Sequence, residues 1–201
     1  MTTHKLDNLS STAKLFNAGW LSLGCLLLIS ACVSVRAPSS EEMALIDNPP
    51  QKVRQKQDLL TPLALDWFKE IETLYLAKGR SLTEKELTIA RSVGVQHPER
   101  VRIVVLADFP SPGNKTLRTE TKNYGMGISA EGSRTIGYII MLKARLKDER
   151  WILAHELTYI AKQEKMGRKA FVRRFIAERE LMGNRRAPMA LDANEVALDF
   201  K

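Results

Sequence analysis

The segment 149–166 constrains the fold of this chain more than any other. It contains no Gly and no Pro, and its central stretch, residues 151–161, reads W-I-L-A-H-E-L-T-Y-I-A. Most of these positions are apolar, as expected of a helix that lies inside a protein core. The apolar positions are Ile152, Leu153, Ala154, Leu157, Ile160 and Ala161. The sequence therefore predicts a buried helix with a few polar side chains in its middle.

The polar side chains of this helix have a defined spacing. His155 and Tyr159 are four residues apart, which in an α-helix is a rise of about 6 Å and about 40° past one full turn, so they share one face. The pattern resembles the H-E-x-x-H helix of zinc metallopeptidases, in which two His bind zinc and the Glu takes a proton from metal-bound water. By this resemblance His155 is the first zinc ligand, Glu156 is the general base, and Tyr159 stands in the place of the second ligand.

A catalytic zinc site needs a third protein ligand, which must come from another segment. Residues 194–199 read N-E-V-A-L-D, which resembles the N-E-x-x-x-D signature of glutamate-type zincins. The resemblance implies that Glu195 is the third zinc ligand. It also implies that Asp199 orients a ligand His through the second ring nitrogen.

A wider likeness covers residues 82–196, about half of the chain. It resembles a family of small bacterial zincin-like proteins in the segments A-R-S-V-G-V (90–95), P-E-R-V-R-I (98–103), G-Y-I-I-M-L (137–142) and L-A-H-E (153–156). The implied fold class is α+β and zincin-like, with a small mixed sheet packed on the active-site helix and additional helices on both sides in sequence. In zincins the strand before the metal helix is the edge along which an extended substrate pairs. The resemblance thus implies a substrate-edge strand formed by Ile139, Ile140, Met141 and Leu142.

Tyr159 leaves two functions open. A phenol has a reference pKa of about 10, so its deprotonation at neutral pH costs roughly 4 kcal/mol, and its oxygen lies about 6.5 Å from Cβ, which overshoots a metal held by His155. One hypothesis is a degenerate metallopeptidase-like domain with weakened or lost zinc binding and a binding or scaffold role. The other is an active zinc-dependent peptidase of the cell envelope. Apart from His155, the mature chain has only His97, which precedes Pro98 and suits a surface turn.

The N-terminal region predicts export. Residues 15–35 carry no charge, and their apolar centre at 25–29 is typical of a secretory signal. The sequence I-S-A-C at 29–32 resembles a bacterial lipobox, which implies that residues 1–31 are the signal peptide and that a lipid on Cys32 anchors the chain to the membrane. Val33, instead of Asp, favours the outer membrane if the cell has one. An ordinary cleaved signal and an uncleaved anchor are the alternatives.

The remaining domain organisation is predicted from composition and from the Pro, Gly and capping residues that begin or end helices and strands. Residues 32–60 are polar and marked by Pro, which predicts a flexible tether, and residues 61–201 form the predicted domain. Helices are predicted at 61–79, from the capping-box residue Thr83 to about 93, and at 169–182; strands are predicted at 101–106 and 135–142. The stretch 107–134 is predicted to be irregular. Both cysteines, Cys25 and Cys32, lie in the export segment, so the domain contains no disulfide and no Cys-based metal site.

The chain carries a formal net charge of +8. Its densest basic cluster lies on and around the predicted helix 169–182, whose apolar positions Phe171, Val172, Phe175 and Ile176 are expected to face the core. The cluster is therefore read as a solvated outer face, and no nucleic-acid-binding signature accompanies it. A third hypothesis remains, in which the chain is a basic envelope protein that binds anionic polymers.

Overall fold

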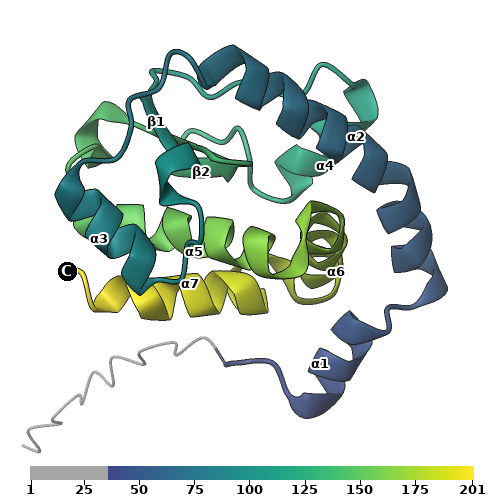
Figure 1. The fold of residues 1–201 in the computed structure, drawn as a ribbon. Helices are drawn as coiled ribbons and strands as arrows, with labels where there is room; N and C mark the ends of the chain where they lie inside the picture. The colour runs from purple at the N-terminus through teal and green to yellow at the C-terminus, as the bar shows by residue number, and fades with distance from the viewer. Residues whose placement is uncertain (1–35) are drawn as a thin grey trace, which may run out of the picture. The chain divides into compact units, whose positions relative to one another are not determined.

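The computed structural model describes residues 36–201, so the predicted signal peptide and Cys32 lie outside the described residues. The described part has an α+β fold with seven α-helices and one three-stranded mixed sheet (Figure 1). Among these residues, none of the helices combines the length and the apolar character that a bilayer crossing requires.

The first two helices occupy the predicted tether. Helix α1 spans Ser40–Asp47 and starts at a capping box formed by Ser39 and Glu42, and α2 spans Gln51–Tyr75. The prediction that residues 36–60 lack fixed structure and that the helix begins at Thr61 was wrong. Pro62 lies inside α2 instead of near its start. The helix extends through this Pro because buried residues on both sides of it, such as Val53 and Trp67, pack against the rest of the domain.

The next elements follow the sequence pattern closely. Helix α3 spans Glu84–Ser92, and Thr83 forms the predicted capping box with Glu86. The short 3-10 helix η1, Pro98–Arg100, leads into strand β1, Arg102–Val105. Helix α4, Lys115–Asn123, is capped by Asn114 and lies within the stretch that was predicted to be irregular.

The sheet contains a hairpin where one strand was predicted. Strand β2 spans Ser133–Ile136 and β3 spans Ile139–Leu142, and only Gly137 and Tyr138 separate them. Gly137 has φ +59°, a conformation that an L side chain rarely adopts. A Gly in the first position of a two-residue loop is the usual way to turn a hairpin.

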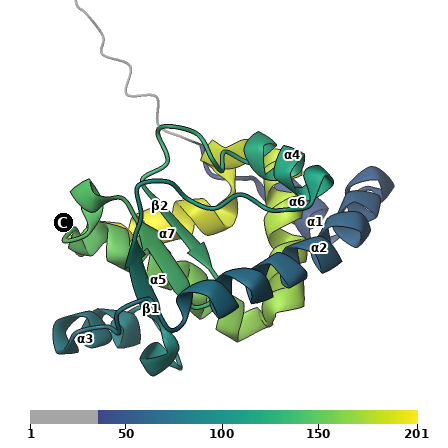
Figure 2. The same ribbon diagram turned by 90° about the horizontal axis from the view of Figure 1, so that it is seen from above.

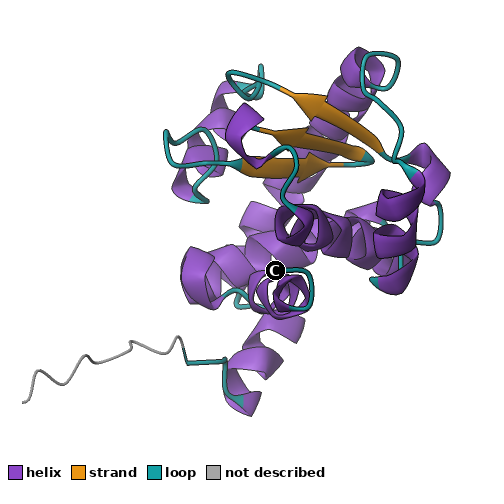
Figure 3. Cartoon of the chain, turned by 90° about the vertical axis from the view of Figure 1, so that its left-hand side faces the viewer, coloured by secondary structure: helices purple, strands orange, loops and turns teal. Residues whose placement is uncertain are grey.

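The strand order is β1-β3-β2, with β1 parallel and β2 antiparallel to β3 (Figure 3). The prediction that Ile139, Ile140, Met141 and Leu142 form a substrate-edge strand was wrong. Both edges of β3 are already hydrogen-bonded to neighbouring strands, and all four residues are buried. The edge strands are β1, whose Ile103 also bridges to Arg80, and β2.

Three helices complete the fold: α5, Arg150–Met166, α6, Arg168–Arg186, and α7, Pro188–Leu198. The short 3-10 helix η2, Ala144–Leu146, joins β3 to α5. The predicted buried helix is confirmed as α5, which packs against α7, α6 and β2. Figure 1 shows α2 and α5 on opposite sides of the sheet, and Figure 2 shows α2 passing across α6.

The alternating side chains of β3 divide the core into two clusters. Ile139 and Met141 pack with residues of α2 and α6, whereas Ile140 and Leu142 pack with residues of α3 and α5. This division follows from the two-residue period of a strand, which sends successive side chains to opposite faces. The His155 helix and the long helix α2 therefore cover different faces of the sheet.

Helix α6 has the predicted apolar face, and its basic residues are paired. Phe171, Val172 and Ile176 are buried. Arg173 pairs with Asp58 at 2.6 Å, and Arg174 pairs with Asp47 at 2.9 Å. Arg186 and Arg168 pair likewise with Glu42 and Glu72. These pairs attach α6 to α1 and α2, so much of the basic cluster serves as internal contacts.

Glu72 joins three separate parts of the chain. Its Oε1 accepts a hydrogen bond from the backbone N–H of Tyr138 in the hairpin loop at 3.0 Å. Its Oε2 accepts from Arg168 Nη1 at 2.7 Å, and Arg168 Nη2 also donates to this carboxylate. One side chain on α2 thus fixes both the hairpin and the start of α6.

Candidate functional site

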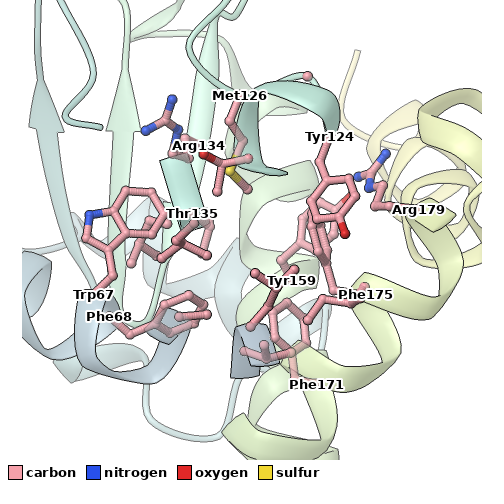
Figure 4. A pocket seen from close by; sticks show the side chains of 18 of the residues that line it. Trp67, Phe68, Tyr124, Met126, Arg134, Thr135, Tyr159, Phe171, Phe175 and Arg179 are labelled. Carbon is pink, nitrogen blue, oxygen red and sulfur yellow. The ribbon is translucent and has the colours of Figure 1, made fainter. Parts of the chain in front are cut away.

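A pocket of about 230 Å³ lies between α2, α4, β2, α5 and α6. Most of its wall is aromatic or aliphatic (Figure 4). The aromatic residues that line it are Trp67, Phe68, Tyr124, Tyr159, Phe171 and Phe175. A concave apolar wall with a few polar groups is the usual form of a small-ligand site.

Helix α5 contributes the three residues whose spacing resembles the metallopeptidase motif. His155, Glu156 and Tyr159 all line this one pocket. The helical spacing that was read from the sequence therefore places them together. Glu156 is buried, with 4% of its surface exposed, and the other two are partly buried.

The carboxylate of Glu156 is held by the edge strand β2. Thr135 Oγ1 donates a hydrogen bond to Glu156 Oε2 at 2.6 Å. A hydrogen bond to a charged group is shorter and stronger than one between neutral groups. This contact fixes the orientation of Glu156 at the pocket wall, as a general base or a ligand-binding group would require.

Tyr159 is packed as an aromatic side chain. Its ring meets His155 edge to face, with centroids 5.4 Å apart, and meets Phe171 in the same way at 6.5 Å. Burial raises the pKa of Tyr159 to about 12, although the positive charge of Arg179 acts in the opposite direction. Ionising this phenol at pH 7 therefore costs about 7 kcal/mol at 1.36 kcal/mol per unit. Tyr159 thus presents a neutral hydroxyl to the pocket.

Arg134 of β2 and Glu131, just before this strand, form a closed ion pair on the pocket wall. Arg134 Nε donates to Glu131 Oε1 at 2.7 Å, and Nη2 donates to Oε2 at 2.6 Å. The third nitrogen, Nη1, donates to the carbonyl of Pro110 at 2.6 Å. Since Arg134 is buried and each of its nitrogens has a partner, it has a structural role in this wall.

Arg179 has a different environment. Its Nη1 donates to the carbonyl and the side-chain oxygen of Asn184, at 2.9 and 3.1 Å, and its guanidinium lies over the ring of Phe175, 4.7 Å from the centroid. Its Nε is buried, and no hydrogen-bond partner for it exists among residues 36–201. A buried donor without a partner is rare and costly.

At the rim beside α4, the polar groups are paired. Tyr124 donates its hydroxyl hydrogen to Glu180 Oε1 at 2.8 Å, and Lys56 binds both Glu120 and Glu180. Burial and the neighbouring Glu180 raise the pKa of Tyr124. Burial lowers the pKa of Lys56, but the hydrogen bonds to both carboxylates outweigh it and raise the pKa overall.

The C-terminal motif lies elsewhere. Glu195 is on α7 and Asp199 follows its end; both are exposed, and neither lines the pocket. Their predicted roles as zinc ligand and orienting residue stay predictions. Within the described part of the chain, no group of three or more His, Cys, Asp or Glu is placed to hold a metal ion. With Tyr159 neutral and Glu195 outside the lining, the pocket residues fit a three-ligand zinc site poorly.

The second histidine of the predicted mature chain, His97, lies at the surface. His97 precedes η1 and has a side chain that is 55% exposed, with Nδ1 3.4 Å from Glu99 Oε1. The prediction of a surface turn is confirmed.

Several lining residues were not predicted from the sequence. The sequence predicts Thr135 only as the start of a strand, and it predicts Arg179 as part of a solvated basic face. The one local signal for Arg179 is its position four residues after Phe175, which on a helix places the guanidinium over the ring. Trp67 and Arg134 reach the pocket from segments that no motif connects to His155.

Comparisons with known proteins identify no relative of this chain. The chain matches no protein-family model, no curated protein and no solved structure. The fold and the pocket thus define an α+β domain with an aromatic-walled site, and its function is inferred from the residues themselves.

Proposed function

We propose that the chain is an exported lipoprotein, anchored through Cys32, whose zincin-like domain has weakened or lost zinc binding and acts as a binding protein. The observation that carries the proposal is the state of Tyr159. It lies in the place of the second zinc ligand, but its ring is packed between His155 and Phe171, and its hydroxyl stays protonated. The pocket around it is open to a ligand.

The position of β2 suggests how a protein partner could bind. Ser133 and Thr135 lie on the edge strand and line the pocket. An extended peptide can add to an exposed sheet edge through main-chain hydrogen bonds, while a neighbouring pocket receives one of its side chains. We therefore assign the substrate-edge or partner-binding role to β2, in place of β3.

An active zinc-dependent peptidase is the second candidate. The observation in its favour is the buried carboxylate of Glu156, oriented by Thr135 beside His155. This is the arrangement that a general base for metal-bound water would need. Zinc held by His155 with help from Glu195 would require α7 residues that are now exposed to turn toward the pocket.

Binding to anionic polymers has less support. Of the basic residues on α6, Arg168, Arg173, Arg174 and Arg186 are engaged in ion pairs with α1 and α2. A partner that competes for these arginines would have to displace carboxylates that hold the fold together.

The zinc content of the full chain, purified in detergent, tests the proposal. We expect well under one zinc per chain and no zinc-dependent cleavage of a peptide library. His97→Ala is the matched control for His155→Ala, because His97 is exposed and does not line the pocket. Stoichiometric zinc that is lost in His155→Ala and retained in His97→Ala would establish the peptidase-like metal site instead.

Tyr159→His gives the complementary test. The substitution restores the i, i+4 pair of imidazoles on one helix face, so zinc affinity should rise by at least tenfold. Isothermal titration with zinc measures the change. An unchanged affinity would show that position 159 does not face the metal position of the zincin motif.

A further inference from the structure

Arg179 presents an unpaired edge to the pocket. Its Nη1 is occupied by Asn184, whereas Nε is buried and has no partner among the described residues; the hydroxyl of Tyr159 is the one pocket group within hydrogen-bonding reach of the guanidinium. The ring of Phe175 supports one face of the guanidinium and limits its movement. A fixed guanidinium edge without an acceptor is well suited to receive one from a ligand.

Arg134 shows what the Nε–Nη2 edge of an arginine binds in this protein. Arg134 uses its own Nε and Nη2 atoms to hold the carboxylate of Glu131, at 2.7 and 2.6 Å. Two parallel N–H donors match the two oxygens of a carboxylate. Arg179 lines the pocket, its Nε has no partner, and it forms no ion pair with a carboxylate of the described residues.

Further donors lie near this edge. The hydroxyl of Tyr159 is neutral and lies within hydrogen-bonding reach of the Arg179 guanidinium, and the imidazole of His155 lines the same pocket. The carboxylate of Glu156 is held by Thr135, and Figure 4 shows Thr135 across the pocket from Arg179. An anionic group beside Arg179 and Tyr159 would therefore meet the guanidinium and a hydroxyl donor, and the guanidinium would offset the negative charges of Glu156 and Glu178 that also act on Tyr159.

The rest of the pocket favours an apolar ligand body. Trp67, Phe68, Phe171 and Phe175 form its walls. An apolar cavity of about 150 Å³ is large enough to hold benzene. The volume of about 230 Å³ can therefore accommodate a phenyl ring together with a short chain.

We infer that the pocket binds a small amphipathic carboxylate, with its carboxylate on the Nε–Nη2 edge of Arg179 and its aromatic or short alkyl body among the aromatic walls. The inference rests on the proposed binding function and specifies its ligand class. The selectivity comes from Arg179, because the same wall without a charge partner would accept neutral compounds of equal size equally well.

Binding of 3-phenylpropanoate and of its neutral isostere 3-phenylpropanamide tests the inference. The full chain is reconstituted in lipid nanodiscs, with chelator present, and titrated calorimetrically against a reference of empty nanodiscs. We expect the acid to bind at least tenfold more tightly than the amide. In Arg179→Gln the acid should fall to the affinity of the amide, while the amide should bind as before and so report an intact pocket.

Arg185→Gln is the matched control, because Arg185 is an exposed arginine that follows the kink of α6 at Gly183 and does not line the pocket. It should leave both affinities unchanged. Equal binding of acid and amide, an acid affinity that survives Arg179→Gln, or no binding of either probe would overturn the ligand class. These results would not affect the proposed function, which is tested by the zinc content. A stoichiometric, His155-dependent zinc would instead overturn the proposed function, whichever probe binds.

Discussion

Replacement of Gly137 by Ala tests how the hairpin holds β2 against the pocket. Gly137 has φ +59°, and an L residue in this left-handed region costs about 1–2 kcal/mol. A Cβ at this position would lie 2.7 Å from Glu72 Cδ, and closer still to Oε1. Since the contact is too short for a real Cβ, either the hairpin or the Glu72 carboxylate must move.

Movement of Glu72 has a cost of its own. The carboxylate would withdraw from the Tyr138 N–H and from Arg168, and hydrogen bonds to a charged group contribute about 1.5–3 kcal/mol. The two terms together predict that Gly137→Ala lowers the free energy of unfolding by about 2.5–5 kcal/mol. For a domain of this size that would be a large part of the total stability.

A double-mutant cycle in urea unfolding separates the two terms. In a Glu72→Ala background the clash is absent, so Gly137→Ala should cost only the backbone term of about 1–2 kcal/mol. Equal costs in both backgrounds would show that the Glu72 contact plays no part. A neutral Gly137→Ala would refute the left-handed turn itself.

Three more perturbations have defined outcomes. Thr135→Val removes the donor to the buried Glu156 and should reduce stability by about 1.5–3 kcal/mol in urea, whereas Thr135→Ser, which keeps the hydroxyl, should cost much less. Arg134→Ala leaves the largely buried side chain of Glu131, 11% exposed, without its partner and should cost about 3–5 kcal/mol by the same assay; a loss below 1 kcal/mol would mean that water replaces the guanidinium. Hydrogen bonding from Arg186 lowers the pKa of Glu42 to about 2, so its contribution to stability is complete above the unfolded pKa of about 4.5 and is lost as the pH falls toward 2. Glu42→Gln should flatten that part of the acid-unfolding curve, and an unchanged curve would assign the acid sensitivity to other carboxylates.

The elements that the sequence predicted are those whose signals are local. The capping box at Thr83, the apolar face of α6 and the uninterrupted helix around His155 depend on residues within a few positions of one another. Helix α2 was misplaced because Pro62 resembles a helix start, and its continuation depends on burial of Val53 against distant residues. The hairpin was missed because Gly137 interrupts an otherwise continuous strand-like run.

For the site, too, the sequence predicted only the residues that lie close together in the chain. The spacing of His155, Glu156 and Tyr159 was enough to bring them to one wall, since a helix fixes it. The opposite walls come from α2, β2 and α6, and no local pattern indicates that Trp67, Thr135 and Arg179 meet. The edge position of β2 also depends on pairing between strands, which the apolar run of β3 does not specify.

The three-way contact of Glu72 has a consequence for folding kinetics. Its hydrogen bonds span 66 residues to Tyr138 and 96 residues to Arg168. Contacts across such separations require closure of long loops and are expected to form after the local helices and the hairpin. Loss of Glu72 should thus speed unfolding and leave the rate of folding nearly unchanged, which makes this carboxylate a determinant of how long the folded pocket persists.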